Sequence, residues 1–372
     1  MTSFDVAVIG AGATGSAALY ALARRGLRVL GLEQFRAGHN RGSSHGVSRI
    51  IRYGYYEHPS YVPLVRHADA QWHAIEQGSG RTLRHRTGIL EIGTLDATLI
   101  RGTLASSREH GLAHDVLDAG EVMRRFPAFQ IPSDFIGVLQ PDGGWLEVEP
   151  SIHALLDLAK AARAQLREGV RVRGLEPNNR GVRIIMDDGS IETRSVIVAA
   201  GPWMRAFVPD LPLRVTRQVV GWFDPLEPQL FAPERFPIFM LETHHGIHYG
   251  FPLHVQGLKI AKHFHSNEAV DADRVDRTIS RKDEATMREA IAEHLPAANG
   301  ALRRATPCLY TMTPDGDFIL DRLPQHPQIV VASPCSGHGF KFAPVIGEIL
   351  ADLATGKATA HDISRFRIGR FA

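Results

Sequence analysis

The sequence has 372 residues, of which 44% are hydrophobic and 22% are charged, and this is the composition of an ordinary soluble globular protein. A chain of this length predicts about two domains, and a formal net charge of +2 gives no argument for a nucleic-acid partner or an acidic membrane surface. The longest apolar runs are far shorter than the roughly 20 residues that a membrane-spanning helix needs.

The start of the chain predicts a strand, a glycine-rich turn, a helix and a second strand. Residues 4–9, FDVAVI, form the nearly continuous apolar run that is typical of a buried parallel strand. The turn GAGATG follows at residues 10–15, and an alanine- and leucine-rich segment with helical spacing runs from it to Gly26. The second strand, RVLGLE, ends in the acidic residue Glu33. This order is the fingerprint of a dinucleotide-binding unit.

Each residue of the fingerprint has a physical role. Gly10 allows the tight turn, Gly12 lets backbone N–H groups approach a pyrophosphate, and Gly15 lets the helix pack against the strand. The helix N-terminus offers unpaired N–H groups to the phosphates. Glu33 can accept hydrogen bonds from ribose hydroxyls, and its charge would repel the extra phosphate of NADP. The motif alone does not decide between NAD and FAD.

A later segment favours FAD. Residues 181–205 predict a hairpin around Asp188 and Gly189, followed by a buried strand, VIVAA, that breaks at Gly201 and Pro202. A late strand that ends in this way is common where a flavin domain returns to the adenine side of its cofactor. Together with the first motif, it predicts an FAD site that includes Gly201.

A loop rich in Gly, Ser and His follows the second strand. Residues 38–46, which include Ser43 and His45, can lie against a planar cofactor. Arg49 and Arg52 come next and are three positions apart, so on a helical turn they would share one face. Two guanidinium groups beside a cofactor loop predict a site for an anion, because Arg binds carboxylates bidentately. The alternative is that both are ordinary surface arginines.

Two strands of a second sheet are predicted at residues 246–253 and 257–265. Alternation in the second strand places Lys259, His263 and His265 on one face with the small Ala261 between them, which leaves room for a substrate. Tyr249, on the first strand, can add an aromatic wall. The alternative is a solvated sheet face.

Three histidines, His244, His245 and His248, suggest a metal site at first sight. The cluster lacks the Glu of a zinc-binding helix, and no second ligand group is evident in the sequence. We therefore expect no metal.

Near the C-terminus, residues 336–356 predict a glycine-rich turn that enters an apolar helix. The N–H groups of the turn, around Gly337 and Gly339, could face an anionic ring. Lys341 falls in the first helical turn, where the macrodipole disfavours a cation, so a bound anion would account for it. The alternative is an exposed lysine whose charge is screened by solvent.

By these residues the chain resembles the sarcosine oxidase branch of the D-amino-acid-oxidase superfamily, the family of monomeric sarcosine oxidase and N-methyltryptophan oxidase. The resemblance runs nearly end to end. Its segments, in order, are GAGATG (10–15), GSSHGVSRIIR (42–52), YVPL (61–64), YGFP (249–252), GLKIAKH (257–263), CLYTMTPDGDFILD (308–321), SGHGFKFA (336–343) and FRIGRF (366–371).

The resemblance implies how the cofactor is held. In the family, the cysteine that Cys308 matches forms a thioether to the 8α-methyl group of FAD, so we expect FAD to be covalently bound through Cys308. Cys335 has no such match and is expected to serve packing. Two cysteines in such a chain fit a reducing cytoplasm, and the sequence MTSFDVAVIG has no recognisable signal peptide. We expect a cytoplasmic protein.

The resemblance also implies roles around the substrate. Arg52 and Lys341 resemble the pair that binds the substrate carboxylate. His263 and Tyr249 resemble residues that line the substrate face and position the substrate, and Tyr310 is expected near the pocket.

The resemblance implies a further group of functional residues beside the flavin. Lys259 matches the lysine that stabilises the charge developing on O₂ in the relatives, with Arg49 and His45 as its neighbours on the flavin.

The predicted fold is α/β, with a Rossmann-like FAD-binding domain interleaved with a second domain built on a mixed, antiparallel-rich sheet. The expected FAD-binding domain comprises residues 1–85, 145–213 and 305–372, and the substrate-binding domain comprises 86–144 and 214–304.

The predicted function is oxidation of an N-methyl or other secondary amino acid to an imine, with O₂ reduced to H₂O₂, by a monomer. One alternative is a primary amino acid or glycine oxidase of the same superfamily. Another is a dehydrogenase that passes electrons to a protein acceptor. The natural substrate stays open.

Overall fold

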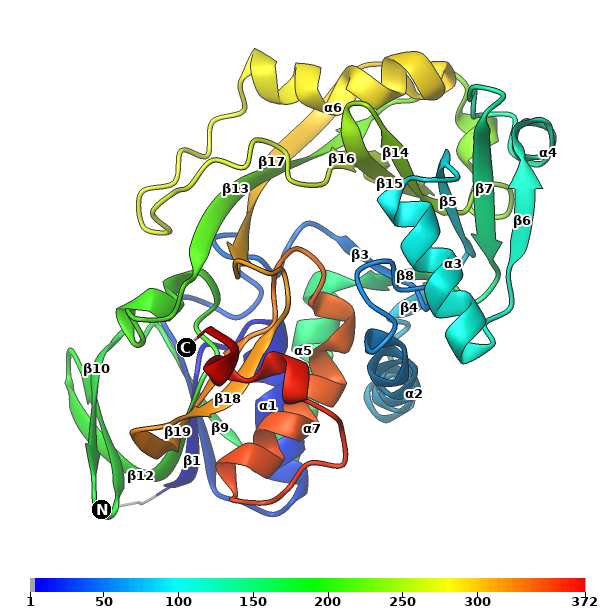
Figure 1. Cartoon of the computed structure of the whole chain (residues 1–372). Coiled ribbons are helices and arrows are strands. Elements are labelled where there is room, and N and C mark those ends of the chain that lie inside the picture. The colour runs from blue at the N-terminus through cyan, green and yellow to red at the C-terminus, as the bar shows by residue number, and fades with distance from the viewer. Residues whose placement is uncertain (1–3, 372) are drawn as a thin grey trace.

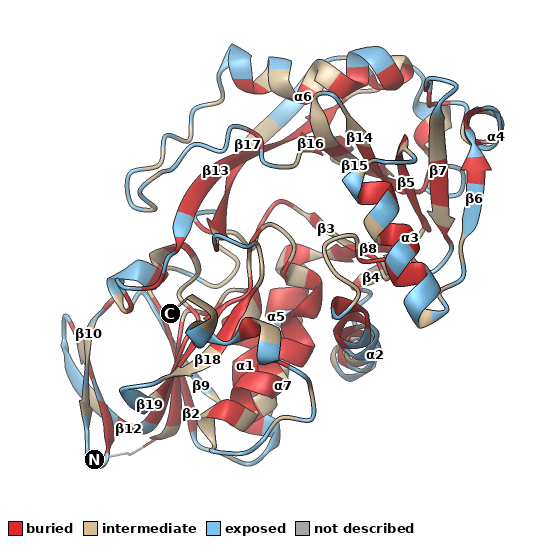
Figure 2. Ribbon diagram, in the orientation of Figure 1, coloured by how far each residue is buried: buried red, intermediate tan, exposed pale blue. Residues whose placement is uncertain are grey.

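The computed structural model describes residues 4–371. Figure 1 shows two large sheets with a small one between them, and helices that pack against both large sheets. The buried residues concentrate in the first sheet and the helices against it, and along the middle of the second sheet (Figure 2). The predicted fold class is confirmed, because a mostly parallel sheet and a mostly antiparallel sheet are both present.

The first large sheet contains the dinucleotide fingerprint. Its central strand pairs in parallel with strands on both sides, as the continuous apolar run predicts. The order is β10-β11-β12-β1-β2-β9, and β19 pairs with β12 and β18. The strands are β1 (Phe4–Ile9), β2 (Val29–Glu33), β9 (Gln165–Glu168), β10 (Val172–Asn178), β11 (Gly181–Met186), β12 (Gly189–Val198), β18 (Ile319–Leu323) and β19 (His326–Ser333).

Three helices pack against this sheet and one packs beside them. α1 (Ala13–Arg24) approaches α7 (Ala343–Ala354) so closely that a Cβ at Gly347 would lie 2.6 Å from the backbone of Ala17. A larger residue than Gly at 347 would push these helices apart. α5 (Val148–Ala161) packs on the other side of α1, and α2 (Tyr61–Ser79) lies against α5 and α7.

The second large sheet is mixed and mostly antiparallel. Its order is β17-β13-β16-β15-β14-β5-β7-β6, and only β14 and β5 pair in parallel among these strands. α3 (Thr98–His110), α4 (Ala119–Arg125) and α6 (Arg281–His294) cover it. The strands are β5 (Ile89–Thr94), β6 (Asp115–Asp118), β7 (Phe135–Gln140), β13 (Arg214–Phe223), β14 (Ile238–Thr243), β15 (Gly246–His254), β16 (Gly257–Lys262) and β17 (Leu302–Met312).

The small sheet corrects one prediction. Arg49 does not lie on a helical turn, because residues 48–51 form strand β3 (Ser48–Ile51), which pairs with β8 (Gly144–Glu147). The β-branched Ile50 and Ile51 favour this extended pairing. β4 (Arg84–Arg86) completes the sheet. The remaining elements are short 3₁₀ helices: η1 (Gly201–Ala206), η2 (Pro228–Phe231), η3 (Pro296–Ala298), η4 (Phe340–Phe342), η5 (Ser364–Phe366) and η6 (Ile368–Phe371).

The expected domain boundary at residue 305 falls inside β17, which pairs with β13 over nearly its whole length. A boundary after Met312 therefore fits the hydrogen bonding better, and the division into two domains stays a prediction. Among residues 4–371, no helix is both long enough and apolar enough to cross a membrane.

Candidate functional site

A cavity of about 1960 Å³, counting the space open to solvent, is lined by residues of both large sheets. Three of the predicted site residues do not line it: Gly15, His45 and Lys259. The others are brought together there from segments far apart in the sequence: Gly10, Gly12, Glu33, Ser43, Arg49, Arg52, Gly201, Tyr249, His263, Cys308, Tyr310, Gly337, Gly339 and Lys341.

The glycine-rich turn is packed so tightly that side chains are excluded. A Cβ at Gly10, whose φ is +94°, would lie 2.5 Å from the carbonyl oxygen of Ala199. A Cβ at Gly15 would lie 1.8 Å from the carbonyl oxygen of Gly10, which explains why Gly15 packs α1 against β1 and does not face the cavity. Gly12 is the N-cap of α1 and has no side chain to cover the first N–H groups.

Glu33 lies at the end of β2 and joins this turn to the cavity wall. Its carboxylate accepts hydrogen bonds from the backbone N–H of Ala11, at 2.7 Å, and of Phe35, at 2.9 Å. Phe35 and Trp203 place aromatic rings nearby, with centroids 5.5 Å apart. Trp203 directly follows the predicted strand end at Gly201 and Pro202 and lines the cavity, whereas Phe35 belongs to no motif and packs against Trp203.

The donor set of this end of the cavity fits FAD. It offers a helix N-terminus whose N-cap, Gly12, has no side chain, a carboxylate for the ribose and an aromatic ring for the adenine. In addition, Ser43 lines the cavity, and its Oγ is buried without a hydrogen-bond partner among residues 4–371. Orphaned polar atoms next to a cavity indicate a bound group that would pair with them.

Cys308 lies on β17 and is buried beside a cation. Arg49 Nη2 lies 3.4 Å from Cys308 Sγ and 2.9 Å from the carbonyl oxygen of Ser43. Arg49 Nη1 donates to the carbonyl oxygen of Ser48, at 2.9 Å. The guanidinium is therefore locked between the loop and the thiol, where it can stabilise negative charge on sulfur.

Lys259 is held behind the same loop rather than in the cavity. Its Nζ donates to the carbonyl oxygens of Gly46, at 2.8 Å, and Ser48, at 2.7 Å, and lies 3.2 Å from Ser48 Oγ. Burial, together with the charge of Arg49, lowers the pKa of Lys259. Three acceptors nevertheless match the three N–H bonds of an ammonium group, and Phe251 presents its ring face 4.6 Å away.

His45, in this loop, carries no charge at neutral pH. Burial, followed by the charge of Arg49, lowers the pKa of His45 to about 3. The sequence analysis placed His45 beside the flavin, but His45 is not one of the residues that line the cavity.

Arg52 is buried and forms an ion pair that the sequence analysis missed. Its Nη2 lies 2.7 and 2.6 Å from the two carboxylate oxygens of Glu57. Burial works against ionisation of Glu57, but the charges of Arg52, His338 and Lys341 outweigh it and lower the pKa of Glu57 to about 2. Sequence evidence for this ion pair was weak, because an acidic residue five positions from an arginine is common in any sequence.

Lys341 lies in η4, the 3₁₀ turn immediately before α7, and not in the first α-helical turn as predicted. Pro344 explains the offset, because it occupies the second position of α7 and the chain enters the helix there. Lys341 Nζ donates to the carbonyl oxygen of His338, at 2.8 Å, and lies 3.4 Å from Tyr55 Oη. Burial and the nearby charge of Arg52 lower the pKa of Lys341 to about 7.

His263, Tyr249 and Tyr310 form another wall of the cavity. Tyr310 Oη lies 3.5 Å from His263 Nδ1. Burial lowers the pKa of His263 to about 3, so the imidazole is neutral. Burial likewise raises the pKa of both tyrosines, so their hydroxyl groups keep their protons.

The predicted strand around His263 is too long. β16 ends at Lys262, and Phe264 has a φ of +58°, which breaks the extended conformation. His265 consequently leaves the substrate face, and its Nε2 lies 3.1 Å from Asp283 Oδ1.

The cavity wall also includes residues that no motif identified. Gln218 from β13, Met240 from β14 and Tyr56 line it with the predicted residues. Cys335 lines it as well, and its Sγ accepts from the backbone N–H of Thr311 at 3.4 Å. Nothing in the sequence separates such residues from ordinary core residues of a sheet.

His244, His245 and His248 do not form one cluster in the structure. His248 is buried and its Nε2 lies 3.2 Å from the carbonyl oxygen of Thr286. His244 and His245 lie together on the surface, and α6 brings Glu293 to them, with His245 Nε2 3.0 Å from Glu293 Oε1. The sequence did not show Glu293 as a neighbour of these histidines, because α6 is distant in sequence, and the expectation of no metal stays a prediction.

Comparison with known proteins agrees with this geometry. The family model for FAD dependent oxidoreductases matches residues 5–353. The chain is 37% identical to monomeric sarcosine oxidase of Bacillus sp. (strain B-0618), covering 99% of this chain and 96% of that protein. It is 35% identical to N-methyl-L-tryptophan oxidase of Salmonella heidelberg (strain SL476), covering 99% of each.

Among solved structures, the chain is similar to the open form of NikD, an unusual amino acid oxidase essential for nikkomycin biosynthesis. The TM-score is 0.87 at 28% identity, over 99% of this chain and 98% of that one. Glycine oxidase from Geobacillus kaustophilus has a TM-score of 0.83 at 20% identity, over 99% of each chain, and shows the shared fold alone.

Proposed function

We propose that this chain, which belongs to the family of FAD-dependent oxidoreductases, oxidises N-methyl or other secondary amino acids with O₂ as acceptor. One observation carries the proposal: the buried cations Arg52 and Lys341 line the same cavity as the dinucleotide turn and Cys308. A buried cation pair beside a flavin site fits a substrate that carries a carboxylate. The relatives named for sarcosine and N-methyl-L-tryptophan support the secondary-amine class.

We assign the cofactor to the residues that fit it. The turn at Gly10 and Gly12, with Glu33, would hold the adenosine and pyrophosphate, and Ser43 Oγ would pair with the ring system. Cys308 would hold the cofactor covalently through its sulfur, with Arg49 stabilising the charge on sulfur during attachment. When bound, FAD supplies an electron acceptor that takes a hydride equivalent from a C–H bond next to nitrogen and passes the electrons to O₂.

Arg52 and Lys341 bind the carboxylate of the substrate. Arg52 can offer two parallel N–H groups to it, but in the resting structure Nη2 donates to both carboxylate oxygens of Glu57 and Nη1 donates to the carbonyl oxygen of Gly54. The substrate carboxylate must therefore replace Glu57 on the guanidinium. Lys341 adds a second charge once it is protonated, and the arriving carboxylate favours its protonation.

The same cations prepare the amine. A secondary amine is protonated in water at neutral pH, and an ammonium group cannot give up a hydride readily. Positive charges at Arg52 and Lys341 make the ammonium form more costly, so the bound amine loses its proton more easily. The neutral imidazole of His263 can accept a hydrogen bond from the amine, and Tyr249 and Tyr310 restrict its position.

Lys259 and Arg49 serve the reaction with oxygen. Transfer of an electron to O₂ creates a negative charge, and a fixed cation stabilises that charge where it forms. Lys259 is held by three acceptors behind the loop of residues 42–48, so its position costs no reorganisation during the reaction. Its charge would act through this loop rather than by direct contact with the cavity.

We further propose that the enzyme is a cytoplasmic monomer. The relative from Bacillus is described as monomeric, and the two cysteines are both free in the structure, as in a reducing compartment. The cofactor-binding domain would comprise residues 1–85, 145–213 and 313–372, and the substrate-binding domain residues 86–144 and 214–312.

The test is production of H₂O₂ by the purified holoenzyme from sarcosine, N-methyl-L-tryptophan, L-pipecolate, L-proline and glycine. We expect at least one of the four secondary amino acids to exceed glycine in kcat/KM. The Arg52→Met/Lys341→Met double variant should lose most of that kcat/KM, while an amine without a carboxylate should be equally poor for both proteins. Fastest turnover of glycine would instead support the glycine oxidase class, whose fold this chain shares.

Electron transfer to a protein acceptor is the second candidate. It would be favoured if bound flavin were reduced by these substrates, yet a synthetic electron acceptor restored turnover that O₂ could not sustain.

A further inference from the structure

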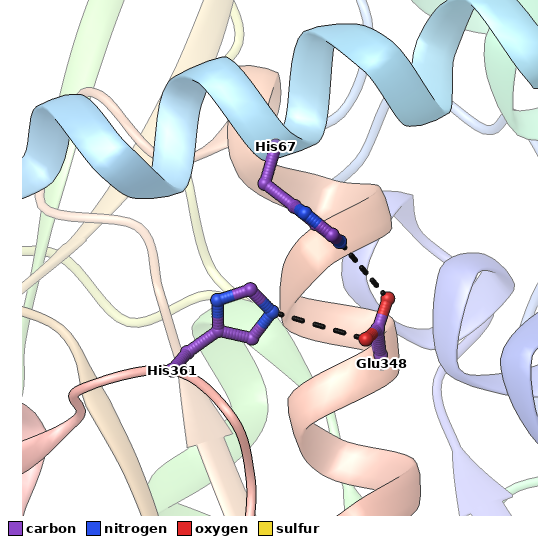
Figure 3. A group of neighbouring side chains, drawn as sticks. All are labelled: His67, Glu348 and His361. Carbon is purple, nitrogen blue, oxygen red and sulfur yellow. Dashed lines mark hydrogen bonds and ion pairs between the residues drawn. The ribbon is translucent and has the colours of Figure 1, made fainter.

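Two helices and the C-terminal segment bring a group of possible metal ligands together outside the cavity. His67 lies on α2, Glu348 lies on α7, and His361 lies in the segment between α7 and η5. Figure 3 shows the two imidazole rings pointing at the Glu348 carboxylate from either side. None of the three residues lines the cavity described above.

The spacing of these groups is close to that of a tetrahedral site. His67 Nε2 lies 3.2 Å from Glu348 Oε2, and His361 Nε2 lies 3.8 Å from Glu348 Oε1. All three ligand atoms lie within 4.8 Å of one another. With metal–ligand bonds of about 2.0–2.2 Å, adjacent ligand atoms in a tetrahedron are separated by roughly 3.3–3.6 Å. Small side-chain rotations would complete this geometry.

We propose that His67, Glu348 and His361 bind a Zn²⁺ ion, with water at the remaining position. Two imidazoles and one carboxylate are a ligand set that Zn²⁺ accepts in proteins. They differ from the oxygen-only sets that Ca²⁺ and Mg²⁺ prefer.

The state of His361 supports a ligand role. Its side chain is 14% exposed, and its Nε2 is buried without a hydrogen-bond partner in the part of the chain that the structure describes. A ring nitrogen that no hydrogen bond occupies is free to bind a metal.

A neighbouring residue would orient the carboxylate. Gln71, one turn after His67 on α2, donates a hydrogen bond from Nε2 to Glu348 Oε2. Hydrogen bonds from such partners hold metal ligands in position. The negative charge of Asp352 also lies near His361, which favours a cation there.

The other surface group, His244, His245 and Glu293, is a poorer site. Two of its three residues, His244 and Glu293, are exposed, whereas in the proposed site only His67 is exposed. The ammonium group of Lys262 lies close by, bound to Glu289, whose carboxylate is 4.0 Å from His245. This group therefore serves as a matched control.

The proposed ion would join α2, α7 and the C-terminal segment. These three parts of the chain are distant in sequence, so a shared ion would bind the folded chain far better than the unfolded one. Binding of this kind raises the midpoint of thermal unfolding. The site therefore has a structural role and lies apart from the proposed chemistry.

The experiment uses holoenzyme without a polyhistidine tag, treated with EDTA and freed of it. ZnCl₂ is titrated by calorimetry, and bound zinc is measured by mass spectrometry after gel filtration. The variants are His361→Ala, His67→Gln and, as the control, His244→Ala/His245→Ala. Flavin content and H₂O₂ production verify that each variant is folded.

We expect one zinc ion to bind tightly per chain, with affinity at least tenfold weaker in His361→Ala and in His67→Gln and unchanged in the control. At a zinc concentration about 100-fold above Kd, the unfolding midpoint should rise by roughly 3–6 °C, and only where the site is intact. The proposal is overturned if the chain binds no zinc at zinc concentrations on the order of 100 μM. It is equally overturned if all variants bind zinc alike, or if only the control variant loses it.

Discussion

The carboxylate of Glu57 occupies the guanidinium group of Arg52. Arg52 Nη2 donates to both carboxylate oxygens, at 2.7 and 2.6 Å, and the aromatic rings of Tyr55 and Tyr56 lie 4.3 and 4.7 Å from the guanidinium carbon. The cation proposed to bind substrate is therefore neutralised within the chain before substrate arrives. Any carboxylate ligand must compete with Glu57, and this competition can be measured.

Replacement of Glu57 by Gln should tighten the binding of a small carboxylate such as propionate. A charge-assisted hydrogen bond contributes about 1.5–3 kcal/mol, so loss of the competitor should lower Kd by roughly tenfold or more. The same change leaves Arg52 buried without its counter-charge, so thermal stability should fall. Kd is measured from the change in flavin absorbance.

Glu91→Gln, which removes a buried carboxyl that does not contact Arg52, is the control. Equal Kd values for Glu57→Gln and the parent would contradict the competition.

Cys308→Ala should leave FAD bound without a covalent bond. Acid precipitation of the holoenzyme should keep the yellow colour in the pellet, whereas the variant should release it into the supernatant. Cys335→Ala is the matched control, because this second thiol also lines the cavity. Release of colour from the parent protein, or retention in Cys308→Ala, would rule out attachment through this sulfur.

Carboxylate binding should depend on pH through Lys341. Burial and Arg52 lower its pKa to about 7, so the free enzyme carries this charge below pH 7 and loses it as the pH rises. Affinity for propionate should be highest below pH 7 and then fall, by at most about tenfold per pH unit. Lys341→Arg should bind without this decline, because a guanidinium group stays charged, and Lys341→Met should bind weakly at every pH. A decline that persists in Lys341→Arg would assign the titration to another group.

Lys259→Met should slow the reaction of the reduced enzyme with O₂ while leaving reduction by substrate nearly unchanged. Loss of a donor in direct contact with a developing charge costs about 10²–10³-fold in rate, and this range is the upper bound for Lys259, which acts through the loop. Stopped-flow measurement separates the two half-reactions. Lys262→Met is the control, since Lys262 lies on the other face of β16 and pairs with Glu289 at 2.7 Å. If both variants reoxidise at the parent rate, the role of Lys259 is wrong.

Gly10→Ala should reduce FAD content and stability far more than Gly26→Ala. Both glycines have positive φ, +94° and +77°, which costs an L-residue about 1–2 kcal/mol. Only at Gly10 would the new Cβ meet backbone, 2.5 Å from the carbonyl oxygen of Ala199, whereas nothing lies within 4 Å at Gly26. Flavin absorbance and thermal unfolding of the two variants compare these costs. Similar losses in both would show that the close approach at Gly10 has no effect.

The sequence alone determined the dinucleotide unit and the fold class. Strand, glycine-rich turn, helix and acidic strand end follow from local rules, and the structure has β1, α1 and β2 where these rules place them. The roles of Cys308, Arg52 and Lys341 were implied by the resemblance of their segments to a known family. Both kinds of signal lie in short stretches of sequence, so they can be read without knowledge of the packing.

Only the tertiary structure decided the electrostatics and the partners. Pairing with β8 made residues 48–51 a strand rather than a helical turn. Burial makes His263 neutral and brings the pKa of Lys341 near neutrality. Glu348 meets His67 and His361 only because α2, α7 and the C-terminal segment pack together. Desolvation and contacts between distant segments arise from the packed chain, and no local pattern encodes them.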